Sequence, residues 1–142
     1  MHLDHLVGNF EKRKKKTDLV YIVGQPAGED RIKETEKRLG VVFPYQVRLF
    51  YSSFDGLWVA DPPLEIFGLD ALARQDNLIP FSLVDGKIEV AFDCSRINRV
   101  DQWDIVNCHD GYVITHTFAN YWTNKMFAWI DNRRPIWKKW GT

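Results

Sequence analysis

The chain has 142 residues, the usual length of one domain and enough to bury a core without disulfides or metals. Its hydrophobic content of 45% and aromatic content of 14% exclude a disordered chain. Lys and Arg together number 19, as do Asp and Glu, which excludes polyanion binding through overall charge. No apolar run approaches the roughly 20 residues of a membrane span, and no signal peptide is evident, so we expect a cytoplasmic protein without membrane contact.

The charge is unevenly distributed along the chain. Residues 1–50 carry ten Lys/Arg against seven Asp/Glu, a net +3, and residues 51–132 carry five against twelve, a net −7. Residues 133–142 carry four against none, a net +4. The acidic middle is a candidate docking surface for a basic partner. The alternative interpretation is that turns between strands collect aspartate.

The first predicted element is a helix that begins near residue 3. Its apolar stripe has i, i+3, i+4, i+7 spacing and consists of Leu3, Leu6, Val7 and Phe10. The basic run at 12–16 indicates the solvated C-terminal end of this helix, with a nucleic-acid patch as the alternative. Residues 19–23 predict a short strand or an apolar connector, and residues 24–28 predict a loop.

Residues 29–56 predict two helices joined by a tight bend. Acidic residues open the first helix and basic residues close it, as the helix dipole favours. Gly40 suits a left-handed helix end, and Pro44 suits the first turn of the second helix. The second helix has one apolar face made of Val47, Phe50, Tyr51 and Phe54. Asp55-Gly56 then forms a turn.

The same stretch resembles a known family. The motifs that carry the resemblance are Leu39-Gly40, Phe43-Pro44-Tyr45, Leu49-Phe50 and Asp55-Gly56. They resemble the signature of the SUKH superfamily, which includes bacterial immunity proteins of polymorphic toxin systems and the Smi/Knr cell-wall-synthesis regulators of fungi. Looser similarity continues to Ile130, with Thr117 where serine is usual, so the resemblance covers about residues 29–131. These are core and turn residues, which specify a fold better than a function.

The rest of the chain predicts short strands joined by tight turns and one late helix. The expected strands are residues 57–60, 64–67, 78–84, 88–94, 103–109 and 112–118, with a helical turn at 70–74 and a helix at 118–130. Asp85-Gly86 and Asp110-Gly111 are strong hairpin signals. We therefore predict a single α+β domain over residues 1–142, with a mostly antiparallel sheet and helices packed largely on one face. Predicted core positions include Trp103, Ile105, Val113 and Trp129.

Few residues are candidates for chemistry. His2 and His5 have no further ligands near them in sequence, so we predict no metal site and no cofactor. Cys94 and Cys108 are expected to be free thiols, and a thiol nucleophile at Cys108 would need His116 to approach across a hairpin. The aspartates at strand ends are expected to be turn residues, namely Asp93, Asp101, Asp104 and Asp110. We predict no catalytic centre.

Three tryptophans are candidates for contact with a partner: Trp58 near the middle of the chain, and Trp137 and Trp140 near its end. Trp58 lies near the Asp55-Gly56 turn and is either a partner anchor or a core filler. Trp137 and Trp140 neighbour Lys138 and Lys139, an arrangement that either stacks on nucleobases or packs back on the last helix.

The resemblance implies a non-catalytic immunity protein that binds and neutralises a cognate toxin domain, with a nuclease as the leading candidate. Binding would be stoichiometric, with acidic residues steering association and aromatic residues anchoring it. The predicted contact surface is Trp58, Asp61, Asp85, Asp101, Asp104 and Asp110. We expect no direct contact with nucleic acid. The alternatives are a regulatory scaffold of the Smi/Knr type and a small ligand- or nucleic-acid-binding protein.

Overall fold

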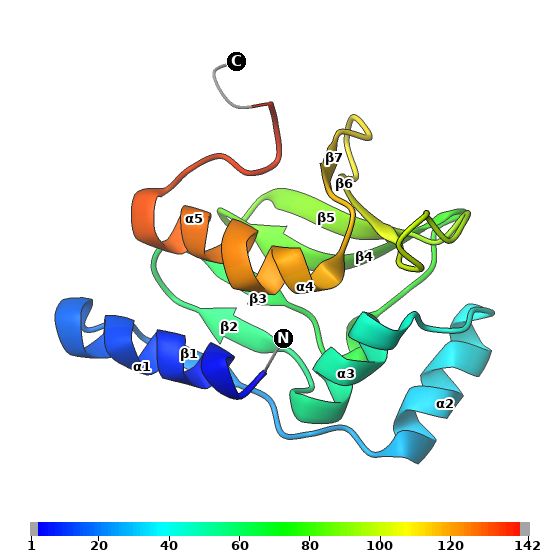
Figure 1. Ribbon diagram of the computed structural model, residues 1–142, viewed down its shortest axis with the longest axis horizontal. Helices are drawn as coiled ribbons and strands as arrows, with labels where there is room; N and C mark the ends of the chain where they lie inside the picture. The colour runs from blue at the N-terminus through cyan, green and yellow to red at the C-terminus, as the bar shows by residue number, and fades with distance from the viewer. Residues whose placement is uncertain (1–2, 140–142) are drawn as a thin grey trace.

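The structure is a computed structural model, and it describes residues 3–139 (Figure 1). Within that range, seven strands form one antiparallel sheet in the order of the chain, from β1 to β7. The strands are β1 (Tyr21–Val23), β2 (Leu57–Val59), β3 (Leu64–Ile66), β4 (Leu78–Val84), β5 (Ile88–Asp93), β6 (Asp104–Asn107) and β7 (Val113–Thr115). The α+β class and the antiparallel sheet are therefore as predicted.

The helices lie before, between and after these strands. They are α1 (Asp4–Thr17), α2 (Glu29–Leu39), α3 (Tyr45–Ser53), the 3-10 turn η1 (Leu69–Ala71), α4 (Phe118–Asn120), the π-helical turn η2 (Tyr121–Lys125) and α5 (Met126–Asn132). The late helix predicted at 118–130 is thus three consecutive segments that end at Asn132. Among residues 3–139, no helix combines the length and apolar character needed to cross a membrane.

The late helical segments cover one face of the sheet (Figure 1). Phe118 packs its ring against Phe81 of β4 and Phe92 of β5, with centroid separations of 5.0 and 4.9 Å. The hydroxyl groups of Tyr121 and Ser82 are hydrogen-bonded at 2.9 Å within this core. Helix α1 joins the same layer, because Phe10 contacts Phe127 at 5.1 Å.

A buried glutamate holds the bend between α2 and α3. Glu36 is 9% exposed, and its carboxylate accepts a hydrogen bond from the backbone N–H of Phe43 at 2.6 Å. Its other oxygen accepts from Arg48 on α3, also at 2.6 Å. Gly40 ends α2 with φ of +69°, in the left-handed region that glycine adopts without strain. The bend predicted from Gly40 and Pro44 is therefore fixed by contacts between the two helices.

The Asp55-Gly56 turn joins the second helix to the sheet. The carboxylate of Asp55 accepts from the backbone N–H of Leu69 at 2.8 Å and pairs with Arg31 of α2 at 2.7 Å. Gly56 has φ of +92°, and a Cβ at this position would lie 2.8 Å from backbone atoms of both Ile66 and Gly68. The motif therefore acts as a structural junction in this chain.

Two predicted details differ from the structure, and two residues singled out in the sequence lie outside the range that it describes. Val113 is 39% exposed, because a β-bulge between Ile105 and Val106 shifts the register of β6 against β7 and places Ile114 in the core. The strands at the second hairpin are also shorter than predicted. Trp137 packs against Trp129 at 5.5 Å, which supports the packed interpretation of the tail. Trp140 and His2 lie outside the described residues.

Candidate functional site

The structure separates the six predicted contact residues into three places. Asp61, Asp85 and Asp110 lie in the turns β2–β3, β4–β5 and β6–β7, which are at the same end of an antiparallel sheet. Asp101 and Asp104 lie at the opposite end, before and at the start of β6. Trp58 is the central residue of β2. These residues therefore do not form one continuous surface.

The three turn aspartates have local roles. Asp61 pairs with Arg133 at 2.6 Å, and its side chain is 77% exposed. Asp85 adopts φ of +59° at the hairpin turn and lies 3.8 Å from Lys87. Asp110 accepts a hydrogen bond at 2.9 Å from the backbone N–H two residues further on. These geometries are those of turn-forming aspartates.

Asp104 is the buried member of the set. Its side chain is 11% exposed and accepts hydrogen bonds from His116 Nδ1 at 2.8 Å and Asn98 Nδ2 at 2.9 Å. Burial raises the pKa of Asp104, but the hydrogen bonds from His116 and Asn98, with the charges of His116 and Arg96, outweigh burial and lower the pKa. This carboxylate is engaged within the protein, so it is not a free steering charge.

Trp58 belongs to a row of side chains on the sheet face away from the helices. Its neighbours in β2, Leu57 and Val59, are buried in the core, so strand alternation directs Trp58 to the other side. The strand registers pair Ile22 with Trp58, Trp58 with Glu65, Glu65 with Leu83, and Leu83 with Glu89. We call these five residues the outer row.

The outer row combines exposed apolar area with negative charge. Ile22 is 61% exposed and Trp58 is 42% exposed. A shallow hollow of about 110 Å³ beside Trp58 is lined in part by Glu65 and Leu83. The two charged members of the row, Glu65 and Glu89, are both acidic. Large exposed apolar side chains rimmed by polar residues are typical of a protein-binding surface.

Sequence reasoning identified Trp58 in this row but missed the other four residues. Ile22 and Glu89 are 67 positions apart in the sequence, and only the pairing of the strands between them brings them into one row. The alternating pattern of residues 88–93 was the available local signal for Glu89.

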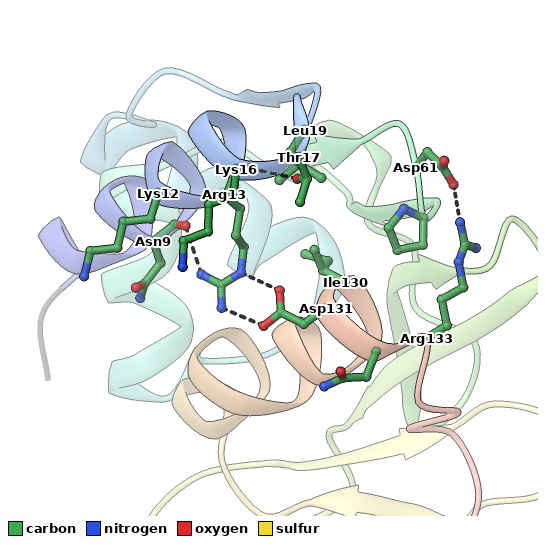
Figure 2. Close-up of a pocket in the computed structure, with 12 residues that line it drawn as sticks. Asn9, Lys12, Arg13, Lys16, Thr17, Leu19, Asp61, Ile130, Asp131 and Arg133 are labelled. Carbon is green, nitrogen blue, oxygen red and sulfur yellow. Dashed lines mark hydrogen bonds and ion pairs between the residues drawn. The ribbon is translucent and has the colours of Figure 1, made fainter.

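A larger and more polar groove lies between α1, the end of α5 and the β2–β3 turn (Figure 2). Its volume is about 800 Å³. Arg13 spans it with two hydrogen bonds to the carboxylate of Asp131, at 2.6 and 2.7 Å, and its guanidinium lies 4.0 Å from the Phe127 ring centre. Arg133 faces Asp61 on the far side. Both guanidinium groups therefore face carboxylates and join the elements around the groove, while Lys12 and Lys16 also line it.

The cysteines do not form a nucleophilic site. Burial and the charge of Glu89 raise the pKa of Cys108 to about 11, which keeps the sulfur protonated at neutral pH. Burial also raises the pKa of Cys94, whose thiol donates to the carbonyl of Asn77 at 3.2 Å. A thiol nucleophile at Cys108 would need His116 as its partner, but His116 Nδ1 is hydrogen-bonded to Asp104. Both thiols are free.

The described residues also contain no cluster of three or more His, Cys, Asp or Glu side chains placed to hold a metal ion. In comparisons with known proteins, no family model and no curated protein match this chain.

Proposed function

We propose that the protein is a non-catalytic immunity protein of the SUKH type, which acts in the cytoplasm by binding one cognate toxin domain. The observation that carries the proposal is the outer row, with half-exposed Trp58 between Ile22 and Glu65. The sequence resemblance at the α2–α3 bend supplies the class of partner. The proposal involves stoichiometric binding and no chemical step on the partner.

Charge complementarity favours a basic face on the partner. Glu65 and Glu89 project from the outer row, and Asp85 lies at the turn after β4. A basic toxin surface, such as that of a nuclease, complements these carboxylates and gains a faster association rate. Trp58 supplies the large rigid anchor that dominates many protein interfaces.

The first test identifies the partner and its effect. The tagged chain is used to capture a partner from its source cells, and that partner is then produced as an isolated domain. The proposal expects one protein, bound 1:1, that stops cell growth when expressed alone and is harmless when expressed with this chain. Recovery of several non-toxic host proteins and no toxin would overturn it and favour a regulatory scaffold.

The second test places the interface on the outer row. Trp58→Ala is expected to weaken toxin binding by about 30-fold, which corresponds to about 2 kcal/mol at an anchoring tryptophan. Tyr45→Ala is the matched control, because Tyr45 is an aromatic residue that is 70% exposed on α3. Equal effects of the two substitutions would place the interface elsewhere.

Charge reversal tests the electrostatic part separately. Glu89→Lys is expected to slow association at low salt and to reduce its salt dependence, whereas Glu34→Lys on α2 is the control. An association rate that neither substitution changes would refute steering by the outer row.

A further inference from the structure

We propose that the hollow beside the Asp104–His116 pair binds a phosphate monoester anion. This hollow has a volume of about 410 Å³ and is lined by Arg96, Asn98, Arg99, Val100, Asp104 and His116. It lies at the sheet end opposite the β2–β3 and β4–β5 turns, and the inference does not rest on the outer row or on toxin binding.

The lining residues provide an excess of positive charge around a single buried carboxylate. Two arginines and one histidine face the hollow, and Asp104 is the one acidic residue among its lining side chains. Arg96 lies 4.0 Å from Asp104 and is 74% exposed, so its contact with that carboxylate is loose. Arg99 makes no ion pair or hydrogen bond through its side chain within residues 3–139. Its guanidinium is therefore available for an added anion.

The buried carboxylate positions the imidazole. His116 Nδ1 is hydrogen-bonded to Asp104 at 2.8 Å, while the side chain of His116 is 69% exposed. Because Asp104 occupies Nδ1, the remaining ring nitrogen, Nε2, is left to meet a ligand. In the imidazolium form of the ring, Nδ1–H points to Asp104 and Nε2–H donates to a phosphate oxygen.

Asn98 makes the site rigid before any ligand arrives. Its amide group donates to Asp104 at 2.9 Å and to the backbone carbonyl of His116 at 2.8 Å. Its carbonyl oxygen accepts from the backbone N–H groups of Val100 and Gln102, at 3.0 and 3.1 Å. The Asn98 side chain thus ties the loop that contains Arg96 and Arg99 to the end of β7, next to His116. Such preorganisation lowers the cost of binding.

Phosphate is the anion that this set of donors fits best. Planar guanidinium groups bind phosphate oxygens through paired hydrogen bonds, and a doubly charged phosphate monoester gains from each cation around it. The volume falls within the range for small-molecule sites, so the hollow has room for more than the phosphoryl group. Val100, which is 52% exposed, supplies an apolar wall for the remainder of the ester.

The test is a titration of the intact protein, followed by NMR of the His116 ring and the backbone of residues 95–104. The probes are inorganic phosphate and adenosine 5′-monophosphate, with sodium chloride at matched ionic strength as the reference. The expected result is a saturable shift with both phosphate probes, tighter for the nucleotide, and no saturable shift with chloride.

Substitution at Arg99 tests the assignment without disturbing the fold. Arg99→Gln is expected to weaken binding of both probes by about tenfold, the effect of losing one charge-assisted contact. Lys33→Gln, which removes an exposed cation on α2, is expected to leave binding unchanged. Absence of saturation in the unmodified protein, or equal effects of the two substitutions, would overturn the proposal.

Discussion

Replacing Glu36 by alanine should destabilise the protein more than any exposed acidic substitution. The carboxylate bridges the N–H of Phe43 and the guanidinium of Arg48, each at 2.6 Å. Phe43 is 3% exposed, so loss of the acceptor leaves a backbone donor largely away from water. A hydrogen bond to a charged acceptor contributes about 1.5–3 kcal/mol, and the partly exposed ion pair adds up to about 1 kcal/mol.

The expected loss is about 3 kcal/mol in the free energy of unfolding, which corresponds to about 10 °C in Tm for a domain of this size. Urea unfolding followed by tryptophan fluorescence measures it, with a constant m-value as the check that folding stays two-state. Glu36→Gln should cost about 1 kcal/mol, because the amide oxygen still accepts from Phe43 while the charge is lost.

Glu29→Ala is the matched control for this prediction. Glu29 contacts the same arginine at 2.7 Å, but its side chain is 56% exposed and accepts no buried backbone donor. Its loss should cost less than about 0.5 kcal/mol. If the two alanine variants differ by less than about 1 kcal/mol, the buried backbone contact does not hold the bend, and the reasoning is wrong.

Three further predictions follow from single residues. Asp104→Asn should reduce stability at neutral pH, and the difference from the unmodified protein should shrink below about pH 4 in acid-unfolding curves, because a lowered folded-state pKa stabilises only where the unfolded carboxyl is ionised. Alkylation of Cys108 by iodoacetamide at pH 8, followed by peptide mass spectrometry, should be about a hundredfold slower than that of an ordinary exposed thiol. Gly56→Ala should cost about 2–4 kcal/mol in urea unfolding, whereas Gly86→Ala, where an added Cβ meets nothing within 4 Å, should cost about 1 kcal/mol; a smaller effect at Gly56 would contradict the steric argument.

Local signals in the sequence were enough for most elements of the fold. Asp85-Gly86 predicted its hairpin correctly because both residues adopt positive φ there, at 59° and 68°, and the strands on either side pair directly. Gly40 predicted the end of α2 for the same reason. These features depend on a few neighbouring residues and on backbone conformations that few residue types tolerate.

Features set by strand register were not predictable in the same way. Val113 fits an inward position if the second hairpin is regular, but the bulge beside Ile105 reverses the faces of β7. Glu36 illustrates a second limit. Its helical spacing was visible, but nothing in the sequence indicated that a glutamate would be buried as an acceptor for Phe43 and Arg48.

The difference between local sequence signals and the folded arrangement also explains why the acidic segment of residues 51–132 does not form one steering surface. Net charge can be counted along the sequence, but a steering field depends on where the carboxylates lie and whether they are already paired. Asp61 faces Arg133 and Asp104 faces His116, so each loses much of its long-range effect, and they lie at opposite ends of the sheet. Glu65, the strand neighbour of Trp58, and Glu89, two strands further along the row, remain on one face of the sheet. Any partner that this chain attracts by charge should therefore respond to changes in the outer row more strongly than to changes in the turn aspartates.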